Sequence, residues 1–183
     1  LLHALAISEF PLDSYRSFLQ QELHRYITRF IEDGRLTNKH VSSIRDHYVR
    51  QRSCYDLTML CWLNRTARLL GLSFPGDVFK EQLLEYWNGN GFWEDETKTN
   101  MTGDSLVFPF WTGMVASKRM KSICLRAIDQ RGLAIPFPLK YNTHNRGKKV
   151  LASFLAPNYE GSAVWAHLGM IYLNVVKNHD RQK

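Results

Sequence analysis

Three stretches of the chain combine acidic residues with aromatic ones. They are residues 45–48 (RDHY), 91–95 (GFWED) and 158–165 (NYEGSAVW). Sugar-binding sites use aromatic side chains as platforms for the apolar faces of pyranose rings, with polar groups aimed at the hydroxyls. The aromatic candidates for such a platform are Trp93, Trp111, Tyr159 and Trp165. Trp93 and Tyr159 lie in predicted loops and are the better candidates, whereas core packing is the simpler interpretation for Trp111 and Trp165.

The elements that must position these residues are helices of two alternating kinds. Helices with one apolar face are predicted over 14–32, 77–87 and 118–130, and helices that are apolar almost all round over 55–70, 104–116 and 162–177. This alternation predicts an all-α fold with two concentric layers, an inner row buried on most sides and an outer row buried on one. We expect residues 1–183 to form a single α-helical domain.

The connections between the predicted helices also alternate, in length. The long ones lie before the apolar helices, at about 33–54, 88–103 and 131–161. Long loops in compact domains commonly carry function. Because all three lead into N-terminal ends of inner helices, we expect them to gather at one end of the fold, where free backbone N–H groups also lie. The functional site is expected there.

The order of these motifs resembles the six-hairpin, (α/α)6-barrel glycosidases, which include processing α-glucosidases, mannosylglycerate hydrolases, trehalases and the glucosidase domain of glycogen-debranching enzymes. Residues 158–165 are similar to a Tyr-Trp-Arg-Gly-Pro-Val-Trp pattern that opens an inner helix, with Glu160 in place of the Arg. Residues 91–95 resemble Gly-Phe-(Tyr/Phe)-x-Asp, and residues 132–136 resemble Gly-Leu-Pro-(Ser/Thr). Residues 56–71 resemble the Asp-Leu-Asn helix that ends in Leu-Gly.

The resemblance covers about residues 14–177 and implies a segment of an (α/α)6 toroid of alternating inner and outer helices. The chain would supply the middle to C-terminal part of that barrel, roughly its fifth to tenth helices. The remaining helices would lie in the same polypeptide or in another chain, and the missing initiator Met agrees with a fragment. In this family the general base is usually a Glu between the last two helices, which places it outside this chain.

The resemblance implies inverting hydrolysis of an α-glycosidic bond in an oligosaccharide or glucoside. Inversion uses an acid and a base whose carboxyl groups stand roughly 6.5–9.5 Å apart. The implied acid precedes the sixth helix, where we favour Asp46 over Asp56, with Arg45 and Tyr48 as flanking substrate ligands. The alternatives are a surface pair of Asp46 with Arg45 or Arg50, and Asp56 as a helix N-cap.

Glu160 is the second catalytic candidate, as a ligand of sugar hydroxyls or as a base, and Asp104 is a further substrate ligand. The alternative for Glu160 is a favourable charge near a helix N-terminus, and for Asp104 it is capping of its helix. We expect no cofactor and no metal ion, because the chain has no CxxC, no HExxH and no His/Cys pair at ligand spacing. The three cysteines are predicted to be buried in a reducing compartment.

Composition narrows the remaining function classes. The 183 residues are 44% hydrophobic and 13% aromatic, which is enough for a core and excludes a disordered tail. No apolar run approaches the roughly 18 residues of a membrane span, and no signal peptide is evident, so we expect a cytoplasmic protein without a membrane partner. The net charge of +7 is dispersed, with no known nucleic-acid motif, so nucleic acid is not an expected partner.

Two other functions stay open. One is a non-catalytic carbohydrate-binding or scaffold protein of the same fold, favoured because the family's Asp-Asn-Ser-Pro around the acid is absent. The other is a basic helical domain that binds nucleic acid with salt-dependent affinity. The expected partners are a carbohydrate substrate and the remaining helices of the barrel.

Overall fold

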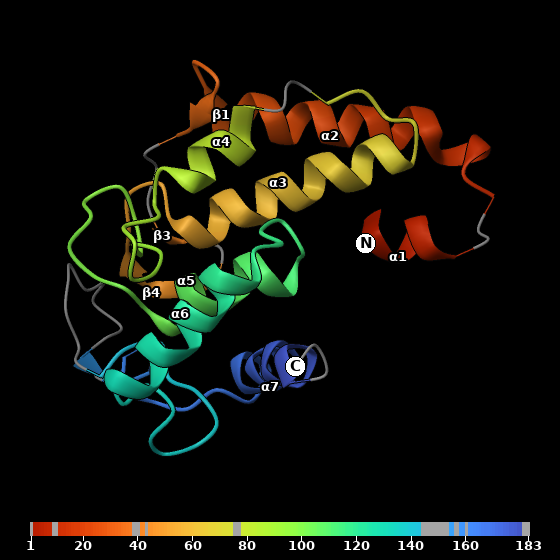
Figure 1. Ribbon diagram of the computed structural model, residues 1–183. Helices are drawn as coiled ribbons and strands as arrows, with labels where there is room; N and C mark the ends of the chain where they lie inside the picture. The colour runs from red at the N-terminus through yellow and green to blue at the C-terminus, as the bar shows by residue number, and fades with distance from the viewer. Residues whose placement is uncertain are drawn as a thin grey trace.

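The computed structural model describes residues 2–8, 11–37, 41–42, 44–74, 78–143, 154–155, 158–159 and 161–180. These residues are mostly helical (Figure 1), which agrees with the predicted all-α class. The helices are α1 (Leu2–Ile7), α2 (Arg16–Phe30), α3 (Cys54–Leu69), α4 (Val78–Leu84), α5 (Gly103–Trp111), α6 (Lys118–Gln130) and α7 (Ala166–Asp180), with a 3-10 turn at Asp13–Tyr15. The strands are β1 (Ile31–Glu32), β2 (Arg35–Leu36), β3 (Val41–Ser42) and β4 (Arg45–Val49). In this described part of the chain, no helix has the length and apolarity that crossing a bilayer requires.

Helices α1, α3, α5 and α7 pack against one another in that order (Figure 1). Outside this row, α4 packs on α3, and α6 packs on α5 and α7. Every residue of α5 from Gly103 to Pro109 is buried, whereas α2 buries only Leu19 and Leu23. The predicted alternation of buried and one-sided helices is therefore confirmed from α2 to α6.

Helix α7 departs from the prediction of a helix that is apolar and buried almost all round. Leu168, Tyr172 and Val175 are buried, but Met170 is 68% exposed and Leu173 is 39% exposed. The buried side chains face α5 and α6, the helices that α7 packs against. An apolar pattern shows which face of a helix is suited to burial, but it does not show whether another element packs against that face.

A capping side chain and a glycine set the bounds of α3. Ser53 begins α3, because its Oγ accepts the N–H of Asp56 at 3.0 Å. Asp56 is therefore not the N-cap, and its carboxylate accepts the Ser53 hydroxyl at 2.6 Å. Gly71 ends this helix as predicted, at a φ of +65°. Pro109 lies inside α5, which ends at Trp111, earlier than the predicted end at 116.

Two β-hairpins are the part of the fold that the sequence analysis did not predict. The helical period runs on to 32, but α2 ends at Phe30, and β1 then pairs antiparallel with β2. The turn between them holds Asp33 and Gly34, both at positive φ. Asp-Gly is a strong signal for a two-residue hairpin turn and could have revealed it. The second hairpin pairs β3 with β4, within the long loop predicted over 33–54.

The three cysteines are free thiols in the interior, as predicted. Cys54 and Cys61 lie on α3, and Cys124 lies on α6. Burial raises the pKa of Cys61 and of Cys124 to about 12, and that of Cys54 well above its ordinary value.

Candidate functional site

The loops before α3 and α5 meet at the beginning of α3. The N–H of Cys54, the first residue of α3, donates to the carbonyl of Glu94 at 2.9 Å. The N–H of Glu96 donates to the carbonyl of Gln51 at 3.0 Å, and the N–H of Gln51 donates to Asp95 Oδ2 at 3.2 Å. The segments before these two helices therefore lie side by side.

The loop before α7 joins them at the beginning of α5. The N–H of Gly103, the first residue of α5, donates to the carbonyl of Tyr141 at 2.8 Å. The N–H of Asn142 donates to the carbonyl of Gly161 at 2.9 Å, and Lys140 forms a β-bridge with Val164, just before α7. The predicted gathering of the three loops is confirmed. We call this end of the fold the rim, defined by residues 50–56, 92–104, 139–142, 158–159 and 161–167.

A buried ion cluster stands within the rim. Arg50 Nη1 donates to Asp104 Oδ2 at 2.7 Å and lies 3.6 Å from Glu94 Oε1. The side chains of Arg50 and Asp104 are completely buried, and that of Glu94 is 5% exposed. Burial lowers the pKa of the Arg50 guanidinium, but Asp104 and then Glu94 raise it by more, so the net pKa is raised. The cluster holds the end of β4 against the first turn of α5.

An aromatic cluster lies at the beginning of α7. The rings of Tyr159 and Trp165 meet edge to face at 4.6 Å, and the Trp165 indole N–H donates to the Tyr159 carbonyl at 2.7 Å. Tyr141 Oη lies 3.0 Å from His167 Nε2, and the His167 ring is 5.6 Å from that of Trp165. Burial lowers the pKa of His167, which favours the neutral imidazole in this contact. Tyr159 remains 39% exposed.

Strand β4 carries the favoured general acid and the two predicted substrate ligands beside it. Arg45, Asp46 and Tyr48 all lie on this strand, which leads directly to Arg50. Their side chains lie outside the part of the chain that the structure describes. Glu160 lies outside the described residues altogether.

Asp104 is placed neither as the expected substrate ligand nor as the cap of its helix. Thr102 is the N-cap of α5, so Asp104 does not cap this helix. Its carboxylate is fully buried against Arg50, with no exposed surface through which it would contact a substrate. The expected substrate ligand is thus a framework residue that fixes Arg50.

The four aromatic candidates separate into two places. Trp93 lies in the rim, half-buried, with its backbone N–H donating to the carbonyl of Tyr86 at 2.9 Å. Trp111 ends α5, about 12 Å along the helix axis from Gly103. It packs edge to face on Trp62 at 5.3 Å but is 37% exposed, so it is not a core residue of the described structure. The rim therefore brings Trp93, Tyr159 and Trp165 to one end of the fold, and Trp111 lies elsewhere.

Two residues of the rim lie outside the predicted site. Arg50 is predicted only as a possible partner of Asp46, and Tyr141 belongs to none of the predicted motifs. Neither belongs to a local motif. A lone Arg in a polar loop does not indicate a buried cluster, and only the fold brings Arg50 to Asp104.

Across the described ranges, no three His, Cys, Asp or Glu side chains come together as metal ligands would. No family model matches the chain, and no curated protein or solved structure matches it significantly.

Proposed function

We propose that this chain is a segment of an (α/α)6 toroid, and that the protein hydrolyses an α-glycosidic bond in an oligosaccharide or glucoside with inversion. The observation that supports the proposal is the rim, where the loops before three successive inner helices are joined by backbone hydrogen bonds. A toroid of helical hairpins needs this arrangement, because its inner helices stand side by side and their N-terminal ends open on one face.

In the proposed mechanism, Asp46 protonates the leaving oxygen, and Arg45 and Tyr48 bind the sugar beside it. These residues lie on β4, whose end is fixed by the buried Arg50 cluster. A well-fixed strand suits a general acid, since proton transfer requires the carboxyl group within hydrogen-bond reach of the leaving oxygen. Glu160 provides the second carboxylate, as a ligand of hydroxyls or as a base.

The aromatic cluster supplies the platform for a pyranose ring. Tyr159 is partly exposed, and its carbonyl holds the indole of Trp165 in place. A ring that is already oriented loses little conformational entropy when a sugar stacks on it. Trp93, on the loop before α5, is the further aromatic candidate at the same end.

One observation favours the alternative, a non-catalytic carbohydrate-binding protein of the same fold. The rim holds five carboxylates with described side chains. Glu94, Asp95 and Asp104 are buried, whereas Asp56 and Glu96 are half-buried and bound to Ser53 and Arg52. Their hydrogen bonds and ion pairs hold the loops together. Each described rim carboxylate is already bound to a neighbouring residue, so the catalytic proposal depends on Asp46.

The test is hydrolysis of α-linked gluco-oligosaccharides and aryl α-glucosides by the full-length protein and its Asp46→Asn variant. We expect the substitution to lower kcat by about 10²-fold or more, because it removes the proton donor. Sugar affinity should be nearly unchanged, since an amide keeps the shape of the carboxyl group. The anomer released by the unsubstituted protein, followed by NMR, reports inversion.

Asp13→Asn is the matched control, because the Asp13 side chain is 98% exposed and far from the rim in sequence. Equal kcat in the Asp46 and Asp13 variants would remove Asp46 from the mechanism. Oligosaccharide binding without hydrolysis would establish the binding alternative. A full-length protein that neither binds nor hydrolyses α-glucosides would refute both.

A further inference from the structure

A cavity of about 630 Å³ lies between α1, α2 and α3. On α3 it is lined by Met59, Trp62, Leu63 and Thr66, which have the i, i+3, i+4, i+7 spacing of one helix face. Helix α2 presents a stripe of the same spacing over residues 19–26. The cavity volume falls within the roughly 300–1,000 Å³ of small-molecule sites. These residues lie outside the rim, so the cavity is separate from the proposed carbohydrate site.

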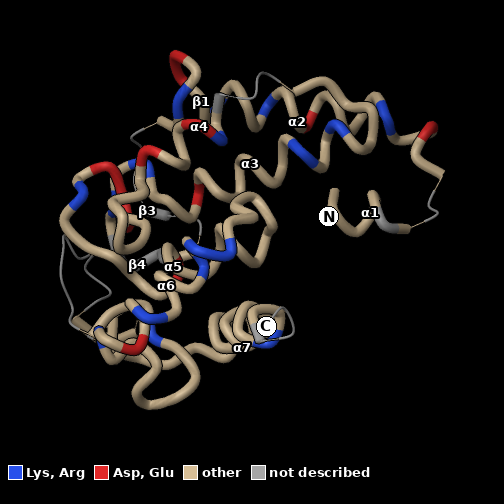
Figure 2. The backbone as a smooth tube through the Cα atoms, in the orientation of Figure 1, with Lys and Arg blue, Asp and Glu red and all other residues tan. Residues whose placement is uncertain are grey.

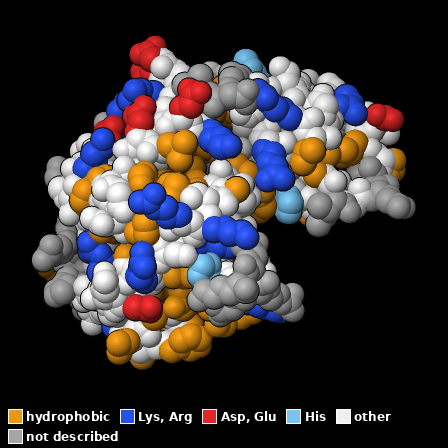
Figure 3. Space-filling view, in the orientation of Figure 1, with side chains coloured by type: hydrophobic (Ala, Val, Ile, Leu, Met, Phe, Trp, Pro, Cys, Tyr) orange, Lys and Arg blue, Asp and Glu red, His pale blue; other side chains and the backbone are white. Residues whose placement is uncertain are grey.

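The described lining of this cavity is largely apolar. Leu2 from α1 and Phe18 from α2 extend its hydrocarbon surface, and α1 carries no Lys, Arg, Asp or Glu (Figure 2). The acidic residue of the described lining is Glu22, which already pairs with Arg25. In the space-filling view, hydrophobic side chains border the place where α1 meets α3 (Figure 3). A charged ligand would lose hydration here, so this lining favours a neutral one.

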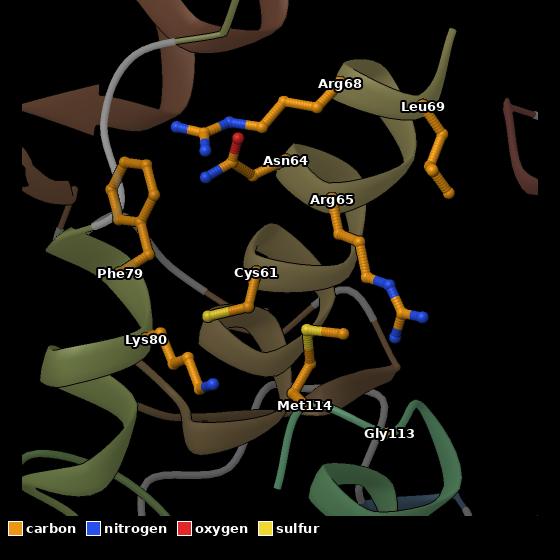
Figure 4. A pocket seen from close by; sticks show the side chains of 9 residues that line it. All are labelled: Cys61, Asn64, Arg65, Arg68, Leu69, Phe79, Lys80, Gly113 and Met114. Atoms are coloured by element: carbon orange, nitrogen blue, oxygen red, sulfur yellow. The ribbon is translucent and has the colours of Figure 1, made fainter.

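Helix α3 presents different residues to its two sides. Its polar residues Asn64 and Arg68 line another cavity, on the side of α4 (Figure 4). Met59, Trp62 and Leu63 line the cavity toward α1 and α2, and all three are half-buried. The apolar surface that they leave uncovered borders the cavity. A ligand that filled the cavity would remove this surface from water, which favours binding.

The ring of Trp62 is held in place by two neighbouring rings. The His3 ring lies 4.7 Å from it, and the Trp111 ring meets it edge to face at 5.3 Å. A side chain that is already oriented loses little conformational entropy when a ligand packs on it. Contacts between aromatic rings also contribute beyond the area that they bury. The cavity is therefore suited to an aromatic ligand.

The hydroxyl of Tyr26 is the polar group of the lining that a ligand would use. Tyr26 lines the cavity, and its hydroxyl donates no hydrogen bond to another described residue. Burial raises the pKa of Tyr26, and the charge of Asp56 raises it further, so the hydroxyl keeps its proton at neutral pH. The hydroxyl of Thr66 is already used, because it donates to the carbonyl of Trp62 at 2.8 Å. Tyr26 would therefore donate to an acceptor on the ligand, such as a carbonyl oxygen.

We propose that this cavity binds a neutral aromatic compound of two fused rings that carries a carbonyl group. The fused rings pack against Trp62 and Leu63, and the Tyr26 hydroxyl donates to the carbonyl oxygen. From Met59 to Thr66 the lining of α3 is about 10 Å long, which suits two fused rings with a short substituent. The inference uses residues outside the rim and stands independently of the proposed carbohydrate chemistry.

The test is a fluorescence titration of the full-length protein with prodan, a neutral naphthyl ketone whose emission shifts to the blue in apolar surroundings. We expect saturable binding with 1:1 stoichiometry. Leu63→Arg should weaken binding about tenfold or more, because it places a guanidinium group in the apolar cavity. Tyr26→Phe should weaken it about fivefold, because one hydrogen bond is lost.

Leu69→Arg and Tyr15→Phe are the matched controls. Leu69 and Tyr15 are 69% and 50% exposed and are not among the described lining residues, so both variants should keep the affinity unchanged. Leu69→Arg adds the same charge to the same helix as Leu63→Arg. The proposal is overturned if prodan shows no saturable binding, or if either cavity variant binds it as tightly as its control.

Circular dichroism and thermal unfolding check that each variant folds. If Leu63→Arg does not fold, the comparison of Tyr26→Phe with Tyr15→Phe decides the proposal, because each of these substitutions removes only a hydroxyl group. None of these outcomes bears on the Asp46 experiment.

Discussion

Arg50 brings a positive charge from the end of β4 into the interior, where Asp104 and Glu94 lie beside it. Such a buried group gains from its partners about what it loses in hydration, so the pairing itself adds little net stability. The loss of one partner is different, because the remaining charges stay buried and uncompensated. Stability at the rim is therefore sensitive to the loss of this single side chain.

We predict that Arg50→Met lowers the free energy of unfolding by about 3–5 kcal/mol, because two carboxylates lose their cation while a similar apolar volume remains. Urea unfolding followed by circular dichroism measures the change. Arg25→Ala is the control, since Arg25 pairs with Glu22 at the surface, with side chains 73% and 44% exposed. It should cost less than about 1 kcal/mol. Equal losses in the two variants would contradict the buried cluster.

For single residues, the sequence predicts contacts between positions close in the chain better than contacts between distant positions. Tyr159 and Trp165 belong to one motif and make contact although only six positions separate them in the sequence. Arg50 and Asp104 are separated by 54 positions. Periodicity records only which face of an element is apolar, so it carries no information about such a pair.

Among the elements, α5 and the loop before α7 approach each other closely at the rim. Gly103, the first residue of α5, lies against the backbone carbonyl of Lys140 and the side chain of Leu139. A Cβ atom at position 103 would overlap the Lys140 oxygen. Glycine is thus required here by space, and its φ is not in the left-handed region.

We predict that Gly103→Ala lowers the free energy of unfolding by about 3 kcal/mol, because a backbone segment of the rim must move. Gly34→Ala is the comparison, since a Cβ there has no neighbour within 4 Å but the residue has a φ of +70°. It should cost about 1 kcal/mol, from backbone strain alone. Chemical denaturation measures both. If Gly103→Ala lowers the free energy of unfolding no more than Gly34→Ala does, then α5 and the segment around Lys140 can move apart at little cost.

Helices with a capping residue and a glycine stop were predictable, whereas the strands carried no clear signal of their own apart from the Asp33-Gly34 turn between β1 and β2. The predicted range for α6 coincides with the observed one, and that for α3 differs by one residue at each end. The strands β1 to β4 are too short to show a clear two-residue period. Each strand is stabilised by backbone pairing with a neighbouring strand, and the residues of one strand alone do not reveal that partner.

In the whole molecule, buried contacts are distributed unevenly along the row of helices. Helix α5 packs against α3, α6 and α7 and is buried along most of its length. Helix α2 is attached through fewer groups. Arg16 Nη1 donates to the Leu70 carbonyl at 2.8 Å, and Gln20 exchanges two hydrogen bonds with the backbone of Ser73. Separate opening of α2 should therefore cost less than opening of α5.

We predict that the amides of α5 exchange with solvent most slowly and report global unfolding, while those of α2 exchange through a smaller local opening. Hydrogen exchange followed by NMR measures both rates. Arg16→Ala should accelerate exchange in α2 and leave α5 unchanged, because it removes the hydrogen bonds to the Leu70 and Gly71 carbonyls and the ion pair with Asp13, none of which involves α5. Equal protection of α2 and α5 would show that the row opens as one unit.

The buried cysteines have a practical consequence for following such openings. A thiol reacts with an alkylating reagent as its thiolate, and burial suppresses both access and ionisation at Cys54, Cys61 and Cys124. Each can be labelled only while its own helix is displaced. Because two lie on α3 and one on α6, the rates at which these thiols are alkylated report separately on the opening of α3 and of α6.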